Sequence, residues 1–151
     1  MSRDRFVELV SEFVQANALD LSHEDPFELV VTVGDIRVRL LVQGDSGDGL
    51  HCIAEFLDEA MRGELTSPSA LNMALNLNFE AHRAEDFHFA LDPQGQPVLL
   101  ARFDLSTLAI DALANIVVQA LDAATLHTLI TTTPGKRQDA SPKIPNYSLR
   151  A

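Results

Sequence analysis

Residues 89–103 read FALDPQGQPVLLARF, and this stretch decides the fold more than any other. Largely apolar runs at 87–91 and 98–103 flank the segment Asp92-Pro93-Gln94-Gly95, whose Asp, Pro and Gly are typical of a tight turn. Two such runs on either side of a short turn predict an antiparallel hairpin.

A long helix is expected to follow this hairpin, with Asp104 or Ser106 as its cap. Apolar residues recur at helical spacing and form one broad stripe. Its members are Leu105, Leu108, Ala109, Ala112, Leu113, Ile116, Val117, Ala120, Leu121 and Ala124. Residues 131–151 contain three prolines and no apolar period, so we expect one domain over 1–130 and a mobile basic tail over 131–151.

Upstream, a second hairpin is predicted. Residues 28–33 and 36–42 are rich in β-branched side chains, and Gly34-Asp35 joins them as a two-residue turn. In the second run, Ile36, Val38, Leu40 and Val42 share one face while Arg37, Arg39 and Leu41 share the other. Residues 50–56 are expected to add a third antiparallel strand.

Two further helices complete the predicted order. Phe6, Leu9 and Val10 follow the spacing of an amphipathic helix over about 3–17, and Ser67-Pro68 is typical of a helix start, predicting a helix to about Glu80. The expected fold is a single α+β domain in the order α-β-β-β-α-β-β-α, with a twisted antiparallel sheet and flanking helices.

Composition and charge exclude several classes of partner. The 151 residues are 46% hydrophobic, and 22 acidic against 11 basic residues give a net charge of -11, which repels phosphate backbones and anionic lipids. We expect no nucleic acid and no membrane as partner, since no run of about 18 apolar residues occurs. A single cysteine favours a reducing cytoplasm. Four of the basic residues lie in the tail: Lys136, Arg137, Lys143 and Arg150.

The sequence offers little evidence of a catalytic, phosphate-binding or metal-binding motif. There is no Gly-x-Ser-x-Gly elbow or phosphate-binding loop, and Cys52 falls on an apolar strand face, where a core role is expected. His82 and His88, with Glu80, Glu85 and Asp86 nearby, form the only cluster of note. We interpret it as a solvated corner and predict no enzyme and no cofactor or metal. The alternative is a small acidic ligand- or metal-binding enzyme domain using this corner.

The sequence has more apolar surface than one small core needs. The helix expected over 68–80 is apolar nearly all round, which favours either burial by both the sheet and the last helix or a dimer interface. The first helix can cover only one face of a sheet, so Val31, Val33 and Leu41 could leave an apolar groove on the opposite face or along the edge.

Over roughly Phe6 to Ile130 the chain resembles the class I type III secretion chaperones, the Tir-chaperone family. The resemblance rests on the opening helix FVELV at 6–10, the strand pair around Gly34-Asp35, the helix LNMALN at 71–76, and above all the block at 89–103 leading into an Ala/Leu-rich last helix. The basic, Pro-containing tail departs from the family pattern.

The resemblance implies a homodimer in the cytoplasm of a Gram-negative bacterium. It would bind the N-terminal non-globular segment of secreted effectors, keep them soluble and secretion-competent, and deliver them to the export ATPase. The family's middle helix points to a dimer interface at Leu71, Met73, Leu75 and Leu77. Effector contacts from the first helix and the sheet would involve Phe6, Val10, Val31 and Leu41. An adaptor outside secretion with the same fold is a further reading.

Overall fold

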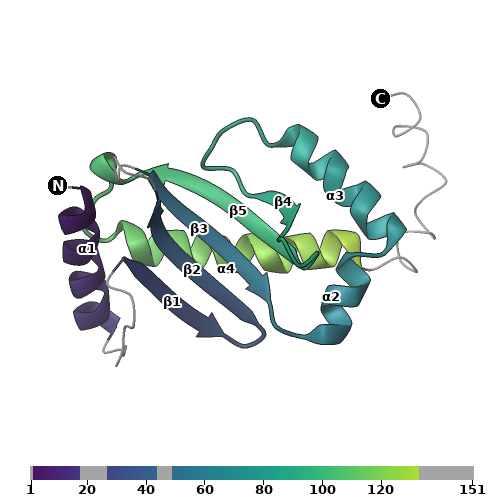
Figure 1. Ribbon diagram of the computed structural model, residues 1–151, viewed down its shortest axis with the longest axis horizontal. Helices are drawn as coiled ribbons and strands as arrows, with labels where there is room; N and C mark the ends of the chain where they lie inside the picture. The colour runs from purple at the N-terminus through teal and green to yellow at the C-terminus, as the bar shows by residue number, and fades with distance from the viewer. Residues whose placement is uncertain (1, 18–26, 44–48, 133–151) are drawn as a thin grey trace.

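The computed structural model describes residues 2–17, 27–43 and 49–132. It confirms the α+β class, with helices and strands in nearly the predicted order (Figure 1). The elements are α1 Ser2–Asn17, β1 Glu28–Val33, β2 Ile36–Gln43, β3 Gly49–Phe56, α2 Glu59–Leu65, α3 Pro68–Glu80, β4 His88–Leu91, β5 Pro97–Asp104, the 3-10 turn η1 Leu105–Thr107, and α4 Ala112–Thr131.

The five strands form one antiparallel sheet in the order β1-β2-β3-β5-β4. Both predicted hairpins are confirmed, and their turns place Gly34 and Gly95 at φ +58° and +78°, a conformation that glycine adopts without strain. The β3–β5 pairing joins the two hairpins across the intervening α2 and α3, so β1 and β4 are the sheet edges.

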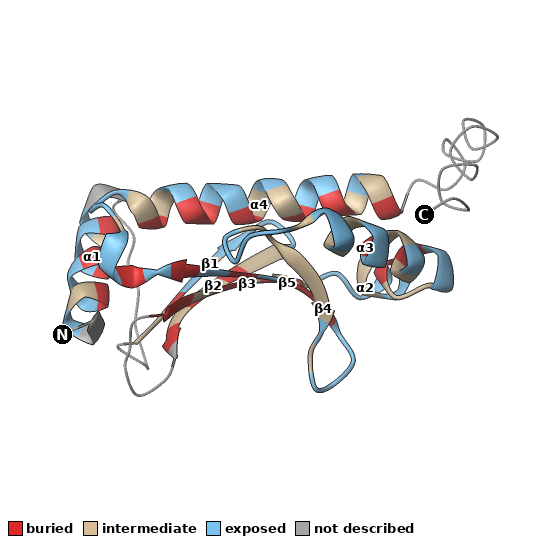
Figure 2. Cartoon of the chain, turned by 90° about the horizontal axis from the view of Figure 1, so that it is seen from above, coloured by how far each residue is buried: buried red, intermediate tan, exposed pale blue. Residues whose placement is uncertain are grey.

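Helix α4 lies along one face of the sheet, and the core fills the space between them (Figure 2). On β2, Val38, Leu40 and Val42 are buried, whereas Arg37 and Arg39 lie on the opposite face, as the alternation predicted. Helix α1 packs against η1 and α4 at the other end of the domain from α3. The core therefore depends on α4 more than on any other helix.

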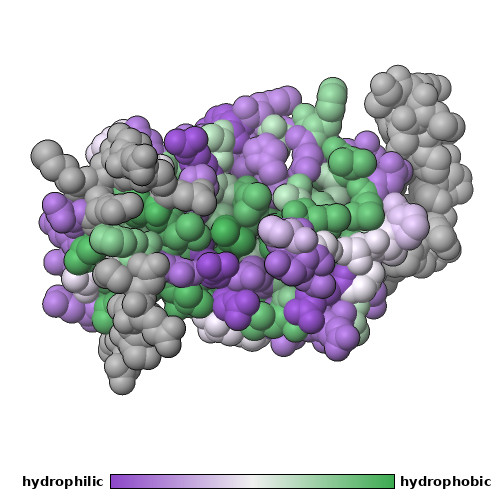
Figure 3. Space-filling model, viewed as in Figure 1, coloured by the Kyte–Doolittle hydropathy of each residue, from purple (hydrophilic) through white to green (hydrophobic). Residues whose placement is uncertain are grey.

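The opposite, open face of the sheet is partly polar. Arg39 pairs with Glu28 at 2.6 Å, and Arg37 pairs with Glu55 at 3.1 Å across neighbouring strands. Apolar side chains lie beside these pairs, among them Val30, Leu41 and Leu100, and Figure 3 shows apolar areas between the charged ones. No described helix lies across this face (Figure 2).

The predicted start of the last helix is wrong. Asp104 does cap, because its Oδ1 accepts from the Ser106 backbone N–H at 3.0 Å, but it caps only η1. Leu105 is completely buried, and the chain leaves the helical path after Thr107, so α4 begins at Ala112. The stripe from Leu105 to Ala124 therefore belongs to two elements.

Helix α2 is an element that the sequence did not predict. It has only seven residues and contains Gly63, so it offers no apolar stripe. Its start is nevertheless marked, since the Asp58 side chain accepts from the Met61 backbone N–H at 3.3 Å. A cap without a periodic helix behind it is a weak signal.

By length and composition alone, α4 could cross a membrane, contrary to the expectation from the sequence, with a mean hydropathy of 1.4 over 18 residues. Burial explains part of this apolar character, because Leu113, Ile116 and Val117 are buried against the sheet, while Val118, Leu126 and Leu129 are exposed. The helix includes Thr131, where the tail was expected to begin, and the rest of the predicted tail, 133–151, lies outside the described residues.

Candidate functional site

Helix α3 stands at the end of the domain opposite α1 and packs against α4 and β4 (Figure 1). The predicted start is confirmed: the Ser67 side chain accepts from the Ala70 backbone N–H at 3.3 Å, and Pro68 occupies the first turn. The side that faces the domain carries Ala70 and Ala74, both completely buried. Small residues let α3 approach closely but bury little apolar surface.

Three large apolar side chains of α3 lie on its outward side. Leu71, Leu75 and Phe79 follow a four-residue spacing, which places them along one line of the helix. We call these three residues the outer stripe. Leu71 is half-buried, but Leu75 is 67% exposed and Phe79 is 84% exposed. Apolar side chains gather over this end of the molecule in Figure 3.

The four predicted interface residues do not share one surface. Leu71 and Leu75 belong to the outer stripe, while Met73 and Leu77 are half-buried on the flank of α3 away from it. Phe79, the most exposed large apolar residue of α3, was missed. The four-residue spacing from Leu71 and Leu75 was the signal that could have found it. The dimer role of these residues stays a prediction.

A single asparagine ties α3 to the sheet. Asn78 donates from Nδ2 to the Phe89 carbonyl at 2.7 Å, and its Oδ1 accepts from the Phe89 backbone N–H at 2.7 Å. Since β4 is an edge strand, these are backbone groups that no neighbouring strand pairs. The amide thus acts as a strand partner and fixes how α3 presents the outer stripe.

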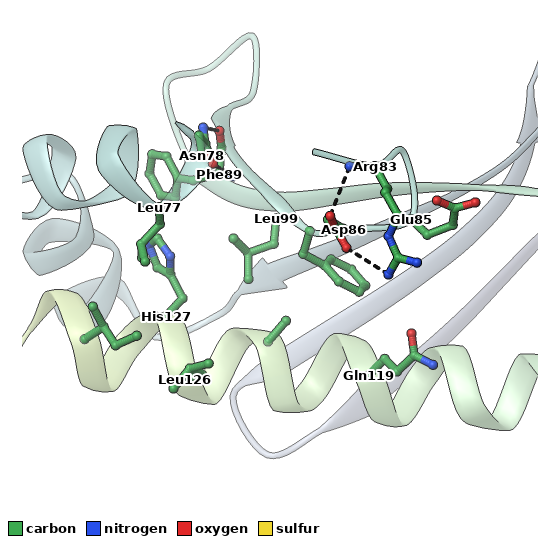
Figure 4. A pocket seen from close by; sticks show the side chains of 13 residues that line it. Leu77, Asn78, Arg83, Glu85, Asp86, Phe89, Leu99, Gln119, Leu126 and His127 are labelled. Carbon is green, nitrogen blue, oxygen red and sulfur yellow. Dashed lines mark hydrogen bonds and ion pairs between the residues drawn. The ribbon is translucent and has the colours of Figure 1, made fainter. Parts of the chain in front are cut away.

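A cavity of about 370 Å³, here the α3–α4 cavity, lies between these helices and the sheet. Leu77, Phe89, Leu99 and His127 line it, while Arg83, Glu85 and Asp86 lie toward one end (Figure 4). The side chains therefore come from α3, the linker to β4, the sheet and α4. The lining is mainly apolar, as in cavities that bind organic groups.

The His82/His88 corner is held by backbone contacts. Asp86 accepts from the backbone N–H groups of Arg83 and His82 at 3.0 and 3.2 Å, and these bonds, with the Arg83 side chain, lower the pKa of its carboxyl. His82 is exposed and His88 lies on β4. Over the described ranges, no three His, Cys, Asp or Glu side chains are grouped to hold a metal. The corner is a capped turn.

Cys52 is a core residue, as predicted. It is completely buried beneath α4, and burial raises the pKa of its thiol to about 12. The thiolate that a nucleophile requires is therefore absent at neutral pH.

A second cavity, about 230 Å³, lies between the β1–β2 turn, α2 and the C-terminal half of α4. Its apolar lining includes Phe56, Met61 and Leu129, and Asp35 and Asp58 add two exposed carboxylates. We call it the acidic cavity. The two cavities flank one helix, because α4 contributes residues to both.

The predicted effector residues are divided between two faces. Phe6 and Val10 are buried in the core. Val31 pairs with the buried Val38 and is half-buried on the core face, whereas Leu41 pairs with Glu28 on the open face. Their effector contacts stay a prediction, and in this chain Phe6 is completely buried while Val10 is 8% exposed.

The sequence matches the model of the Tir chaperone protein (CesT) family over residues 8–126. The chain belongs to the Tir chaperone (CesT) family. The match begins within α1 and ends in the C-terminal half of α4, so it includes the outer stripe and most residues that line both cavities, while His127 lies just beyond it. The resemblance inferred from residues 89–103 and the flanking helices is thus confirmed.

Solved structures share the fold of this CesT family member. A chain of the ExsC–ExsE complex is similar with a TM-score of 0.67 and 18% identity, over 84% of this chain and 93% of that one. The Yersinia pestis type III secretion chaperone SycH, in complex with a YscM2 fragment, is similar with a TM-score of 0.61 and 20% identity, over 80% of this chain and 98% of that one. A chain of the ExoT–SpcS complex from Pseudomonas aeruginosa is similar with a TM-score of 0.57 and 17% identity, over 80% of this chain and 95% of that one. No curated protein sequence matches the chain.

Proposed function

We propose that this CesT family member is a cytoplasmic type III secretion chaperone. It binds the N-terminal non-globular segment of one or more secreted effectors, keeps them soluble and secretion-competent, and delivers them to the export ATPase without catalysing a reaction itself. The observation that carries the proposal is the exposed apolar surface at the α3 end of a chain in a chaperone family. Several of its structural neighbours were solved in complex with a second protein.

The proposal includes a homodimer formed through the outer stripe. Burying a Leu or Phe side chain contributes about 1.5 to 3 kcal/mol, and a two-fold axis would bury Leu75 and Phe79 from both copies. Asn78 supports this role because it holds α3 rigidly against β4. Met73 and Leu77 would then support the interface from behind, and Leu71 would lie at its margin.

Client binding is proposed at the remaining apolar surface. The two cavities beside α4 can each accept a side chain. Over β1 and β2, Val31 would contact client residues on the core face and Leu41 would contact client residues on the open face. Phe6 and Val10 enter the proposal as residues whose packing positions α1. An extended segment that lays alternate side chains into such cavities needs no catalytic group.

The test is co-expression with effectors encoded beside the gene, followed by pull-down and limited proteolysis. We expect an effector to be retained and its N-terminal segment to be protected from protease only while the chaperone is bound. A chain that retains no effector and protects no segment would contradict the proposal.

A further inference from the structure

One buried polar atom in the described fold has no partner. The side chain of His127 is 6% exposed, and its Nε2 makes no hydrogen bond. The ring stacks on Phe89 with 5.0 Å between centroids and 8° between planes, so it is held in a defined position. A buried nitrogen without a partner destabilises a fold, and native structures rarely retain one without a reason.

The unpaired nitrogen belongs to the α3–α4 cavity, which His127 lines together with Leu77, Phe89 and Leu99 (Figure 4). The cavity is accessible, since Arg83, Glu85 and Leu126 at its margin are exposed. A ligand that enters it meets an apolar wall and one group that can exchange a hydrogen bond. Such a site favours an apolar side chain with a single polar atom.

The electrostatics of the cavity favour an uncharged group. Burial lowers the pKa of His127 to about 4, so the imidazole is neutral at physiological pH. At the other end, Arg83 pairs with Asp86 at 3.4 Å, which leaves Glu85 as the further charged group of the lining. A carboxylate or ammonium group beside His127 would have no opposite charge to compensate its desolvation.

We propose that the α3–α4 cavity binds a tyrosine side chain of the client segment, with the phenol hydroxyl hydrogen-bonded to Nε2 of His127. This inference rests on the proposed function. A phenylalanine would leave the nitrogen unpaired, whereas a phenol hydroxyl both donates and accepts and therefore suits either tautomer of the neutral ring. The cavity, at about 370 Å³, has room for the ring.

The inference is tested on the full chain with two matched probes, p-cresol and toluene, which differ by one hydroxyl. Each is titrated into protein labelled with ¹⁵N-histidine, and the imidazole signals are followed by NMR. The sequence has five histidines, and His127→Phe assigns the signal. We expect p-cresol to shift the His127 nitrogen and to bind about fivefold or more tightly than toluene. Equal affinities, or shifts only at other histidines, would overturn the inference.

Two variants separate a binding role from a packing role. His127→Phe keeps a ring against Phe89 and removes the unpaired nitrogen, so the melting temperature should rise by about 2 to 4 °C while the preference for p-cresol disappears. His127→Gln keeps a hydrogen-bonding group and should retain part of the preference. The exposed His82→Gln is the control and should change neither quantity. A preference that survives in His127→Phe would contradict the inference.

The client assignment and the proposed function fail separately. If the chain protects an effector but replacing tyrosines by phenylalanine in the protected segment leaves affinity unchanged, the inference is wrong and the function stands. If no effector is protected, the function fails whatever the probes show. The chain itself has one tyrosine, Tyr147. If Tyr147→Phe shifts the His127 signal of the free protein, the occupant is this chain's own segment and the client assignment is overturned.

Discussion

Helices α3 and α4 distribute their side chains in opposite ways. In α4 the large residues Ile116 and Val117 face the sheet and are buried. In α3 the alanines Ala70 and Ala74 face the domain, while Leu75 and Phe79 point outward. Helix α4 also exposes Val118, Leu126 and Leu129, but it buries Leu113, Ile116 and Val117 against the sheet, so that face of α4 stabilises the fold. The reversed arrangement in α3 is expected of a helix that packs on a second molecule.

The largest effect is expected from a charge placed in the outer stripe of α3. Leu75→Asp should raise the dissociation constant of the dimer by about a hundredfold or more, because the carboxylate would be buried in the interface without a partner. The monomer should stay folded, since Leu75 is exposed within one chain. Light scattering measures the mass and circular dichroism the fold.

The matched control for this substitution is Val118→Asp on α4, where an exposed aliphatic side chain of similar character is replaced. Its mass should equal that of the wild type. If both variants dissociate, or neither does, α3 is not the interface.

The second prediction concerns the attachment of α3. Asn78→Leu keeps the side-chain volume but leaves the Phe89 N–H and carbonyl without their partner, which should lower the free energy of unfolding by about 2 to 4 kcal/mol. Urea denaturation at fixed protein concentration measures it. Asn76→Leu, at an exposed position of the same helix, should change stability by less than about 0.5 kcal/mol. Equal effects would mean that the amide does not hold α3.

The third prediction concerns pH. The pKa of His127 lies at about 4 in the fold and near its ordinary value of 6.5 in the unfolded chain. The unfolded chain therefore binds the extra proton between these values, and stability falls as pH drops from 6.5 toward 4, by about 1 to 3 kcal/mol. Asp86 faces the same cavity, and the hydrogen bonds that it accepts from the Arg83 and His82 backbone lower the pKa of its carboxyl.

His127→Phe should make unfolding less dependent on pH over the same interval, and urea denaturation at pH 7 and pH 4.5 measures the difference. A variant that loses as much stability as the wild type would show that His127 does not titrate on unfolding.

The smallest expected effect concerns the acidic cavity. Asp35→Asn combined with Asp58→Asn should weaken binding of a basic client segment about threefold to tenfold at low salt, and less at high salt. Asparagine at position 58 still caps α2. Fluorescence anisotropy with the protected effector segment measures the affinity.

The control removes the same charge elsewhere: Glu12→Gln combined with Asp111→Asn, at the α1 end of the domain, where Asp111 makes no side-chain cap. If the control weakens binding equally, the effect comes from net charge and not from the acidic cavity.

Local patterns in the sequence predicted most of the fold. Gly34-Asp35, the turn before Gly95 and Ser67-Pro68 each act over a few residues, so the hairpins and the start of α3 could be read directly. The pairing of β3 with β5 depends on residues far apart in the chain and left no local signal.

The candidate site was predicted less well, because exposure is decided by tertiary packing. Phe6 and Phe79 are both aromatic residues on amphipathic helices, yet Phe6 is completely buried and Phe79 is the most exposed large apolar residue of the described chain. Phe6 belongs to a helix that packs on η1 and α4, whereas Phe79 lies on the exposed side of α3. Helical spacing predicts which residues share one side of a helix, but it does not predict whether that side packs on the core or faces solvent.

The most direct test of the account is the mass of the wild-type chain by light scattering at micromolar concentration. A mass near twice 16.5 kDa, reduced to one chain by Leu75→Asp but not by Val118→Asp, is the predicted result. A wild-type mass of 16.5 kDa would contradict the central claim that the outward Leu75 and Phe79 of α3 bind a second copy.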